Sequence, residues 1–336
     1  MGGNNGNPAC LNTGGPASAA AADQGQQDGP PFPEFLEPLP PPPPPRRATG
    51  LLALLLFVVT IFSTLIVGTE FALSYAQRRA PFSDGLFFFG ELFAQPRLLL
   101  LGIPFSFTLM SILLAHELGH YFACRYYGIA ASYPYFIPAP TIIGTMGAFI
   151  RIRSPIVNRR ALFDVGLAGP VVGFLFAVPA LAAAIAYSPV VPGAGLDAPF
   201  AFGRPLLERI LATLLRPGVA ADELLLHPVG RAAWVGLFAT ALNLLPAGQL
   251  DGGHIVYALD SRNHRRISLL VAFGLLLLGW IWPGWMMWSA LLLLFGFRHP
   301  RLLDYWEPLD PARRLWAAIA ILIFILCFMP VPLQSQ

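Results

Sequence analysis

The sequence predicts an all-α polytopic membrane protein with about six to seven transmembrane helices, and three observations support this prediction. Of the 336 residues, 56% are hydrophobic and only 12% are charged, and the mean hydropathy is +0.62. These values exclude an ordinary soluble domain. Several apolar runs reach the roughly 20 residues that a transmembrane helix needs. The 21 basic residues, all arginine, stand mostly between these runs. The lipid bilayer is therefore the expected surrounding, and no nucleic-acid partner is expected.

The first 50 residues differ from the rest of the chain. They are rich in Gly, Ala, Gln, Asn and Pro and end near six consecutive prolines, Pro40–Pro45. We expect a disordered tail over 1–50 with a polyproline II segment. The tail is either a solvated linker or a binding site for a proline-recognising partner. Since no apolar core lies near its start, it is not expected to be a signal peptide.

Apolar runs divide the remaining sequence into predicted spans. Four long runs and a last shorter one are expected to cross the membrane, and two short runs between them form a helical hairpin. In order, the spans are predicted at 51–73, 98–121, 161–186, 232–259 and 315–331, with the hairpin at 267–282 and 285–297. The sequence thus divides into a tail (1–50), a first transmembrane helix with an outer loop (51–97), a core (98–260, with an outer loop at 188–228) and C-terminal helices (261–336).

The positions of the arginines predict an orientation. Arg46 and Arg47 precede the first span and Arg125 follows the second. By the positive-inside rule, these positions favour a cytoplasmic N-terminus. We expect a multi-pass integral membrane protein of a bacterial inner membrane.

Residues 128–155 are not expected to be helical, because Pro134, Pro138, Pro140 and two glycines interrupt them. Apolar and polar residues alternate over 148–153, as in a strand, and a turn is expected at 144–147. Non-helical backbone at membrane depth requires protein or a wet cavity beside it. The sequence therefore predicts a short membrane-embedded β-hairpin. In the outer loop, 204–216 is expected to form a short interfacial helix.

One motif carries recognisable chemistry. His116-Glu117-Leu118-Gly119-His120 ends the second span, and an HExxH sequence on a helix places its histidines on one face, one turn apart. Two neutral imidazoles at this spacing can hold one Zn²⁺, and the glutamate can take a proton from a water on the metal. The alternative is a pair of helix-end histidines hydrogen-bonded to neighbouring groups. Ionisable residues inside a span favour a functional site.

A catalytic zinc site needs a third protein ligand. Asp251 is the best candidate, because it is an acidic residue in an otherwise apolar predicted span. The alternative is a helix-breaking Asp-Gly turn at a span end. Other polar residues are expected to be interfacial, solvated or at a helix start; they are His254, His227, His264, His299, Glu70 and Asp164.

The two motifs together resemble the site-2 protease family of intramembrane zinc metalloproteases. The resemblance rests on HELGH and on Asn243-x-x-Pro246-x-x-x-Leu250-Asp251-Gly252, and it covers about 98–260. It implies that His116, His120 and Asp251 bind one Zn²⁺ per chain, that Glu117 is the general base and that Asn243 lies near the active site. Since the outer loop of about forty residues is too short for a PDZ module, the chain is similar to the PDZ-less members.

The resemblance implies an endopeptidase that hydrolyses a transmembrane segment of another membrane protein, in regulated proteolysis. Two other functions stay open. One is a catalytically silent homologue that acts as a membrane-protein chaperone or scaffold. The other is a metal transporter with ligands at the membrane midplane. A strand at 148–153 is expected either to pair with an extended substrate by β-addition or to plug the site from lipid.

Overall fold

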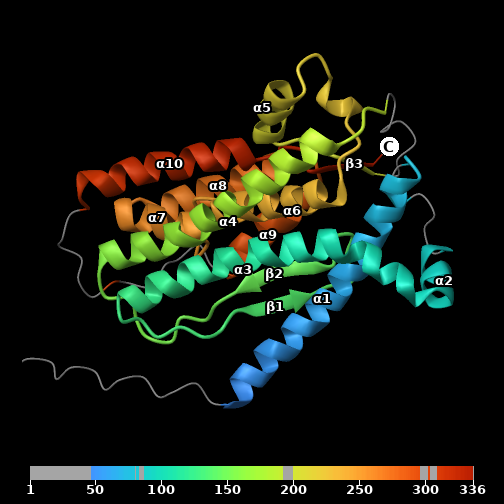
Figure 1. The fold of residues 1–336 in the computed structure, drawn as a ribbon. Coiled ribbons are helices and arrows are strands. Elements are labelled where there is room, and N and C mark those ends of the chain that lie inside the picture. Colours follow the sequence, from blue (N-terminus) through green and yellow to red (C-terminus); the bar gives the residue numbers. More distant parts are fainter. Residues whose placement is uncertain are drawn as a thin grey trace, which may run out of the picture. The chain divides into compact units, whose positions relative to one another are not determined.

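The computed structural model describes residues 47–79, 81–82, 87–191, 200–295, 302 and 309–335. These residues are mostly helical, with two small antiparallel sheets (Figure 1). The predicted disordered tail lies outside the described residues up to residue 46. Its last four predicted residues already belong to the first helix, α1, which spans Arg47–Ala76.

Three helices are long and apolar enough to cross a membrane, and they coincide with the first three predicted spans. They are α1, α3 (Ile103–Tyr126) and α4 (Arg159–Tyr187); a 3₁₀ helix, η1 (Pro96–Gly102), leads directly into α3. The apolar stretches run over Gly50–Ala76, Pro96–Tyr126 and Arg159–Tyr187. At the start of α4, the Asn158 side chain accepts a hydrogen bond from the Ala161 amide at 2.8 Å. Within the described part of the chain, this supports three spans of the six to seven expected.

The fourth predicted span is not one helix. It consists of α6 (Pro228–Asn243) and α7 (Asp251–Leu259), separated by a non-helical loop at 244–250. Pro246 cannot donate a helical hydrogen bond, and Gly248 has a left-handed φ of +58°. The prediction of a continuous span over 232–259 was therefore wrong, and the break places Asp251 at the first residue of a new helix.

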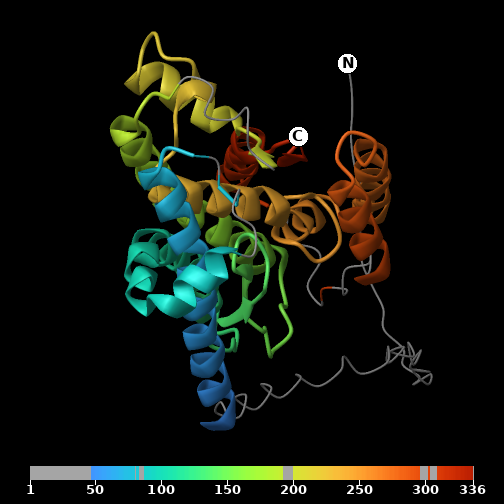
Figure 2. The ribbon, with the colours of Figure 1, turned by 90° about the vertical axis from the view of Figure 1, so that its right-hand side faces the viewer.

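The described residues of the C-terminal part form three further helices. The predicted hairpin consists of α8 (His264–Leu278) and α9 (Gly284–Phe295), and α10 spans Pro311–Cys327. All three are shorter than a perpendicular span requires. Figure 2 shows α8 and α9 as a pair at the side of the other helices.

The outer-loop regions hold short elements. In the segments predicted as outer loops, these are α2 (Phe87–Ala94), α5 (Leu206–Leu215), η2 (Ala221–Glu223) and β3 (Phe200–Phe202). Strand β3 pairs with β4 (Leu333–Ser335), which follows the last helix. The helix predicted at 204–216 corresponds to α5.

The expected β-hairpin is present, with different bounds. Strand β1 (Tyr135–Pro138) pairs antiparallel with β2 (Thr145–Phe149), so residues 144–147 are mostly strand and the turn lies just before them. Gly144, with a φ of +82°, closes this turn, and its carbonyl accepts a hydrogen bond from Ser63 of α1 at 2.6 Å. The contact fixes the hairpin along α1, while β2 lies beside α3 (Figure 1).

Helix α4 is the centre of the fold, since it packs against α3, α6 and α7. Small residues let it do so. At Gly119 of α3, a Cβ atom would lie 2.6 Å from the backbone carbonyl of Ala168, so the two backbones touch there. A fully buried apolar cluster that includes Leu162, Leu181 and Leu237 fills the interface between α4 and α6.

Candidate metal centre

Helix α3 carries the HExxH motif and turns its side chains into the protein. His116, Glu117 and His120 are 5%, 4% and 7% exposed, although the motif lies in a helix with the composition of a membrane span. Burial of three ionisable side chains costs free energy unless a partner compensates them. The structure supplies that partner from a distant part of the sequence.

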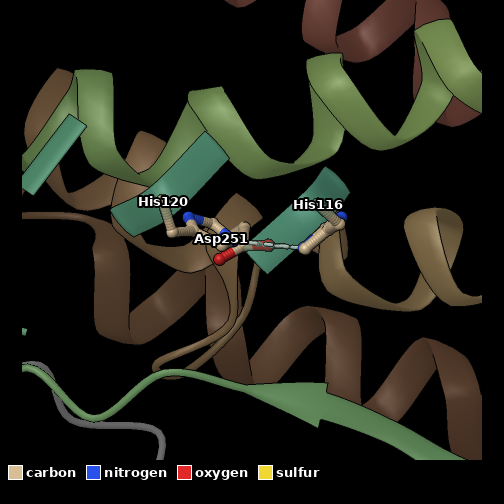
Figure 3. A group of neighbouring side chains, drawn as sticks. All are labelled: His116, His120 and Asp251. Carbon is tan, nitrogen blue, oxygen red and sulfur yellow. Dashed lines mark hydrogen bonds and ion pairs between the residues drawn. The ribbon is translucent and has the colours of Figure 1, made fainter. Parts of the chain in front are cut away.

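Asp251, the first residue of α7, brings its carboxylate between the two imidazoles (Figure 3). Its Oδ2 atom lies 3.2 Å from Nε2 of His116 and 3.3 Å from Nε2 of His120. The two Nε2 atoms are 3.1 Å apart. Among the described residues, these three form the group of His, Cys, Asp and Glu side chains that could hold one metal ion.

The spacing of these donor atoms fits zinc. Three donors that each lie 2.0–2.1 Å from one tetrahedral zinc ion are separated by about 3.3 Å. The three separations in the structure are 3.1–3.3 Å. Two imidazole nitrogens and one carboxylate oxygen are also a donor set that catalytic zinc sites use, and three protein ligands leave a fourth position for water.

A hydrogen bond at Nδ1, the ring nitrogen that does not face the other two donors, fixes the orientation of His120. Its Nδ1 atom lies 2.7 Å from the backbone carbonyl of Val165 in α4 and donates its proton to it. In the neutral ring, Nε2 is then the unprotonated nitrogen, and its lone pair is available to a metal ion held with Asp251 and His116. A hydrogen bond of this kind sets the tautomer of metal-binding histidines.

Glycines of α4 lie against the two histidine side chains and leave space for their rings. A Cβ atom on Gly169 would lie only 2.1 Å from Nε2 of His120, and one on Gly173 would lie 3.1 Å from Nδ1 of His116. A Cβ atom on Gly166 would lie 3.1 Å from the backbone carbonyl of Asp251. This role was not predicted from the sequence, although the spacing of the three glycines places them on one helix face.

The Asp-Gly-Gly sequence has a packing reason. The loop after α6 folds back over the first turn of α7, so a Cβ atom on Gly252 would lie 2.2 Å from the carbonyl oxygen of Leu244. On Gly253, it would lie 2.4 Å from the carbonyl oxygen of Gly248. This close approach connects the position of Asp251 to the conformation of the loop.

Glu117 is not part of the donor triangle. Its carboxylate interacts with the backbone amide of Ile150, just after β2. Asn243, the last residue of α6, lies with Nδ2 3.2 Å from Nε2 of His116. The structure therefore brings together all five residues singled out in the two motifs, from three helices.

Two cavities meet at this centre and share His116, Glu117, Ala148 and Asn243. The first, here called the apolar cavity, has a volume of about 160 Å³. It is lined mainly by Ile112, Leu113, Ile143, Phe238, Leu242 and Trp288. The second, the polar cavity, has a volume of about 190 Å³ and is lined by His120, Gln249, Asp251 and His254, among others. Strand β2 borders both.

Some expectations for other polar residues were wrong. His264 is buried, not solvated. Glu70 is buried in α1, where it accepts hydrogen bonds from Ser74 Oγ and the Phe82 amide, and its interfacial position stays a prediction. Asp164 was expected in the first turn of its helix, but α4 begins at Arg159 and has no acidic residue in its first turn. Asp164 instead forms an ion pair with Arg313 of α10, with 2.9 Å between Nε and Oδ1. His254 lines the polar cavity but is outside the donor group.

Comparisons with known proteins agree with this geometry. A family model described as peptidase family M50 matches residues 104–279. The chain is 32% identical over 240 residues to "Probable zinc metalloprotease EGY1, chloroplastic" of Arabidopsis thaliana, which covers 68% of this chain and 43% of that protein. Identity is also 32% to the EGY2 protein of Oryza sativa subsp. indica, with 69% and 43% covered. The chain spans less than half the length of these relatives. No solved structure matches.

Proposed function

The chain belongs to peptidase family M50, and from this premise we propose that it is a zinc metalloendopeptidase that cuts a peptide bond within or next to a transmembrane segment of another protein. One observation carries the proposal. Three donor atoms from α3 and α7 converge at the spacing of a zinc site, with a carboxylate, Glu117, beside them at the junction of two cavities.

In the proposed mechanism, His116, His120 and Asp251 hold the zinc. When bound there, zinc would supply Lewis-acid chemistry, which makes water a better nucleophile and a carbonyl more electrophilic. Glu117 accepts the proton of the attacking water and passes it to the leaving amine. Asn243 faces the same space and is placed to hydrogen-bond the substrate or the oxygen on which charge develops. We propose both as the catalytic residues.

The setting of the site supports a transmembrane substrate. The motif lies within the apolar stretch Pro96–Tyr126, and the apolar cavity opens beside it. Peptide bonds of an intact helix are shielded by their own hydrogen bonds, so a substrate helix must unwind locally. Strand β2 borders both cavities, and we propose that it pairs with the extended segment by β-addition. The alternative role for the hairpin is exclusion of lipid.

The location in the cell is also proposed. The chain is a membrane protein, and the arginine positions favour a cytoplasmic N-terminus. The bacterial inner membrane stays a prediction, because the relatives carry names that place them in the chloroplast. A role in regulated proteolysis and a partner for the proline-rich tail stay predictions as well.

The test uses purified full-length protein with a single-span reporter substrate. Glu117→Gln should retain about one zinc per chain and lose cleavage, since the substitution removes the base and leaves the three ligands. His116→Ala should lose both the bound zinc and the cleavage activity. Glu91→Gln, the same change at an exposed position of α2, should alter neither. Cleavage by Glu117→Gln at the wild-type rate would exclude the proposed mechanism.

A further inference from the structure

The loop that precedes Asp251 is held by two side chains of α8. The amide of Gly248 donates a hydrogen bond to Ser268 Oγ at 3.1 Å. The carbonyl of Gly248 accepts one from His264 Nε2, also at 3.1 Å. His264 and Ser268 are four residues apart and lie on one face of α8. They are 2% and 1% exposed, so both hydrogen bonds are shielded from water.

Apolar contacts support the same arrangement. Leu245 of the loop packs with Leu275 of α8 and Trp285 of α9 in a buried cluster. The His264 ring stands edge-on to the ring of Tyr257 in α7, with centroids 5.3 Å apart. The start of α8 therefore contacts both the loop and the helix that begins at Asp251.

A short path connects Gly248 to the metal centre. Asp251 is three residues further along the chain, and the carbonyl oxygen of Gly248 packs directly against Gly253 in the first turn of α7. We therefore expect a shift of Gly248 to be transmitted to this turn and to the Asp251 carboxylate. Zinc sites tolerate changes of only about 0.2 Å in ligand distances.

The loss of either side chain has a specific consequence. Without His264 or Ser268, a buried backbone carbonyl or amide of Gly248 is left without its partner. An unsatisfied buried group is costly, so the loop is expected to shift until the group finds another partner.

We propose that His264 and Ser268 are positioning residues of the metal centre, which act through the backbone of Gly248 to hold Asp251 in the donor triangle. The proposal rests on the proposed zinc site and extends it to a helix that contributes no ligand. It assigns the start of α8 a part in metal binding.

The test measures binding of Co²⁺, a spectroscopic substitute for Zn²⁺, to the purified metal-free full-length chain. His264→Leu and Ser268→Ala should each weaken binding by about 10- to 100-fold, the usual effect of changing a residue behind a ligand. Both should also change the visible absorption spectrum of the bound cobalt. His264→Gln, which keeps a donor, should recover most of the affinity and the wild-type spectrum.

Ser289→Ala is the matched control. Ser289 is as buried as Ser268, but it donates its hydrogen bond to Ala272 within the α8–α9 hairpin, 2.7 Å away. It should destabilise the hairpin and leave the cobalt affinity unchanged. Wild-type affinity and spectrum in both His264→Leu and Ser268→Ala would overturn the proposal. An equal loss in Ser289→Ala would do so too, because the effect would then be general destabilisation.

The outcome for the metal site itself is separate. Binding of one Co²⁺ by the wild type, abolished in His116→Ala, supports the proposed function whatever the α8 variants do. Absence of such binding in the wild type would overturn both proposals.

Discussion

Gly169→Ala tests whether the metal centre depends on the space that α4 leaves for the His120 ring. The added methyl group would lie 2.1 Å from Nε2 of His120, whereas ordinary contact begins at 3.4 Å. The imidazole must therefore retreat by about 1.3 Å, or α4 must move away from α3. This displacement is several times the roughly 0.2 Å that a zinc site tolerates.

We expect Gly169→Ala to lower zinc affinity by at least about 100-fold, or about 2.8 kcal/mol at 1.4 kcal/mol per tenfold change. The assay is a competition titration of purified protein with a zinc chelator, followed by metal analysis. Gly274→Ala is the matched control, because a Cβ atom there meets nothing within 4 Å and alanine is the better helix former by about 1 kcal/mol. Wild-type zinc affinity in Gly169→Ala would refute the reasoning.

Three further outcomes are expected. Asp251→Ala should reduce zinc from about one per chain to near zero in metal analysis, because it removes a donor; full occupancy would contradict the assignment. Arg313→Ala should lower the apparent Tm by a few degrees, since it removes the ion pair with Asp164, which is partly exposed and therefore contributes about 1–2 kcal/mol. The control variant Arg314→Ala, at an exposed site, should leave the apparent Tm unchanged. Burial and the hydrogen bond to Asp164 raise the pKa of Tyr127 to about 12. The protonated phenol therefore contributes fully to the free energy of unfolding below pH 10, and this contribution is lost between pH 10 and about 12. Ultraviolet titration should show one phenol with this midpoint that Tyr127→Phe removes; a midpoint near 10 would contradict it.

The sequence predicted those parts of the fold that depend on local pattern. Hydrophobic runs of sufficient length predicted α1, α3 and α4, and the prolines and glycines after α3 predicted a non-helical hairpin. The HExxH spacing predicted two donors on one face of a helix. Asp251 was the best candidate for the third donor because it is an acidic residue in an apolar run, and the resemblance implied the same role. That it meets the two histidines could not be derived from sequence spacing, which does not show which helices come together.

The features that local sequence pattern did not predict depend on tertiary contacts. The apolar composition of 232–259 suggested one span, but Pro246 and Gly248 break the helix and let the loop fold over α7. His264 was expected to be solvated because it stands in a polar stretch, yet it is buried against Gly248. The glycines of α4 lie against the histidine side chains of α3. That they leave space for the histidine rings becomes apparent only when α3 and α4 are placed side by side.

The arrangement of the apolar and polar cavities affects the direction of the proposed reaction. A bond cut between them would leave one new end in an apolar environment and the other in a polar one. These ends prefer different phases, lipid and water. While they are held together, oriented ends have effective concentrations of about 10⁵–10⁸ M, and this advantage disappears once they separate. Departure of the products into two phases would therefore oppose resynthesis of the peptide bond, even where water is scarce.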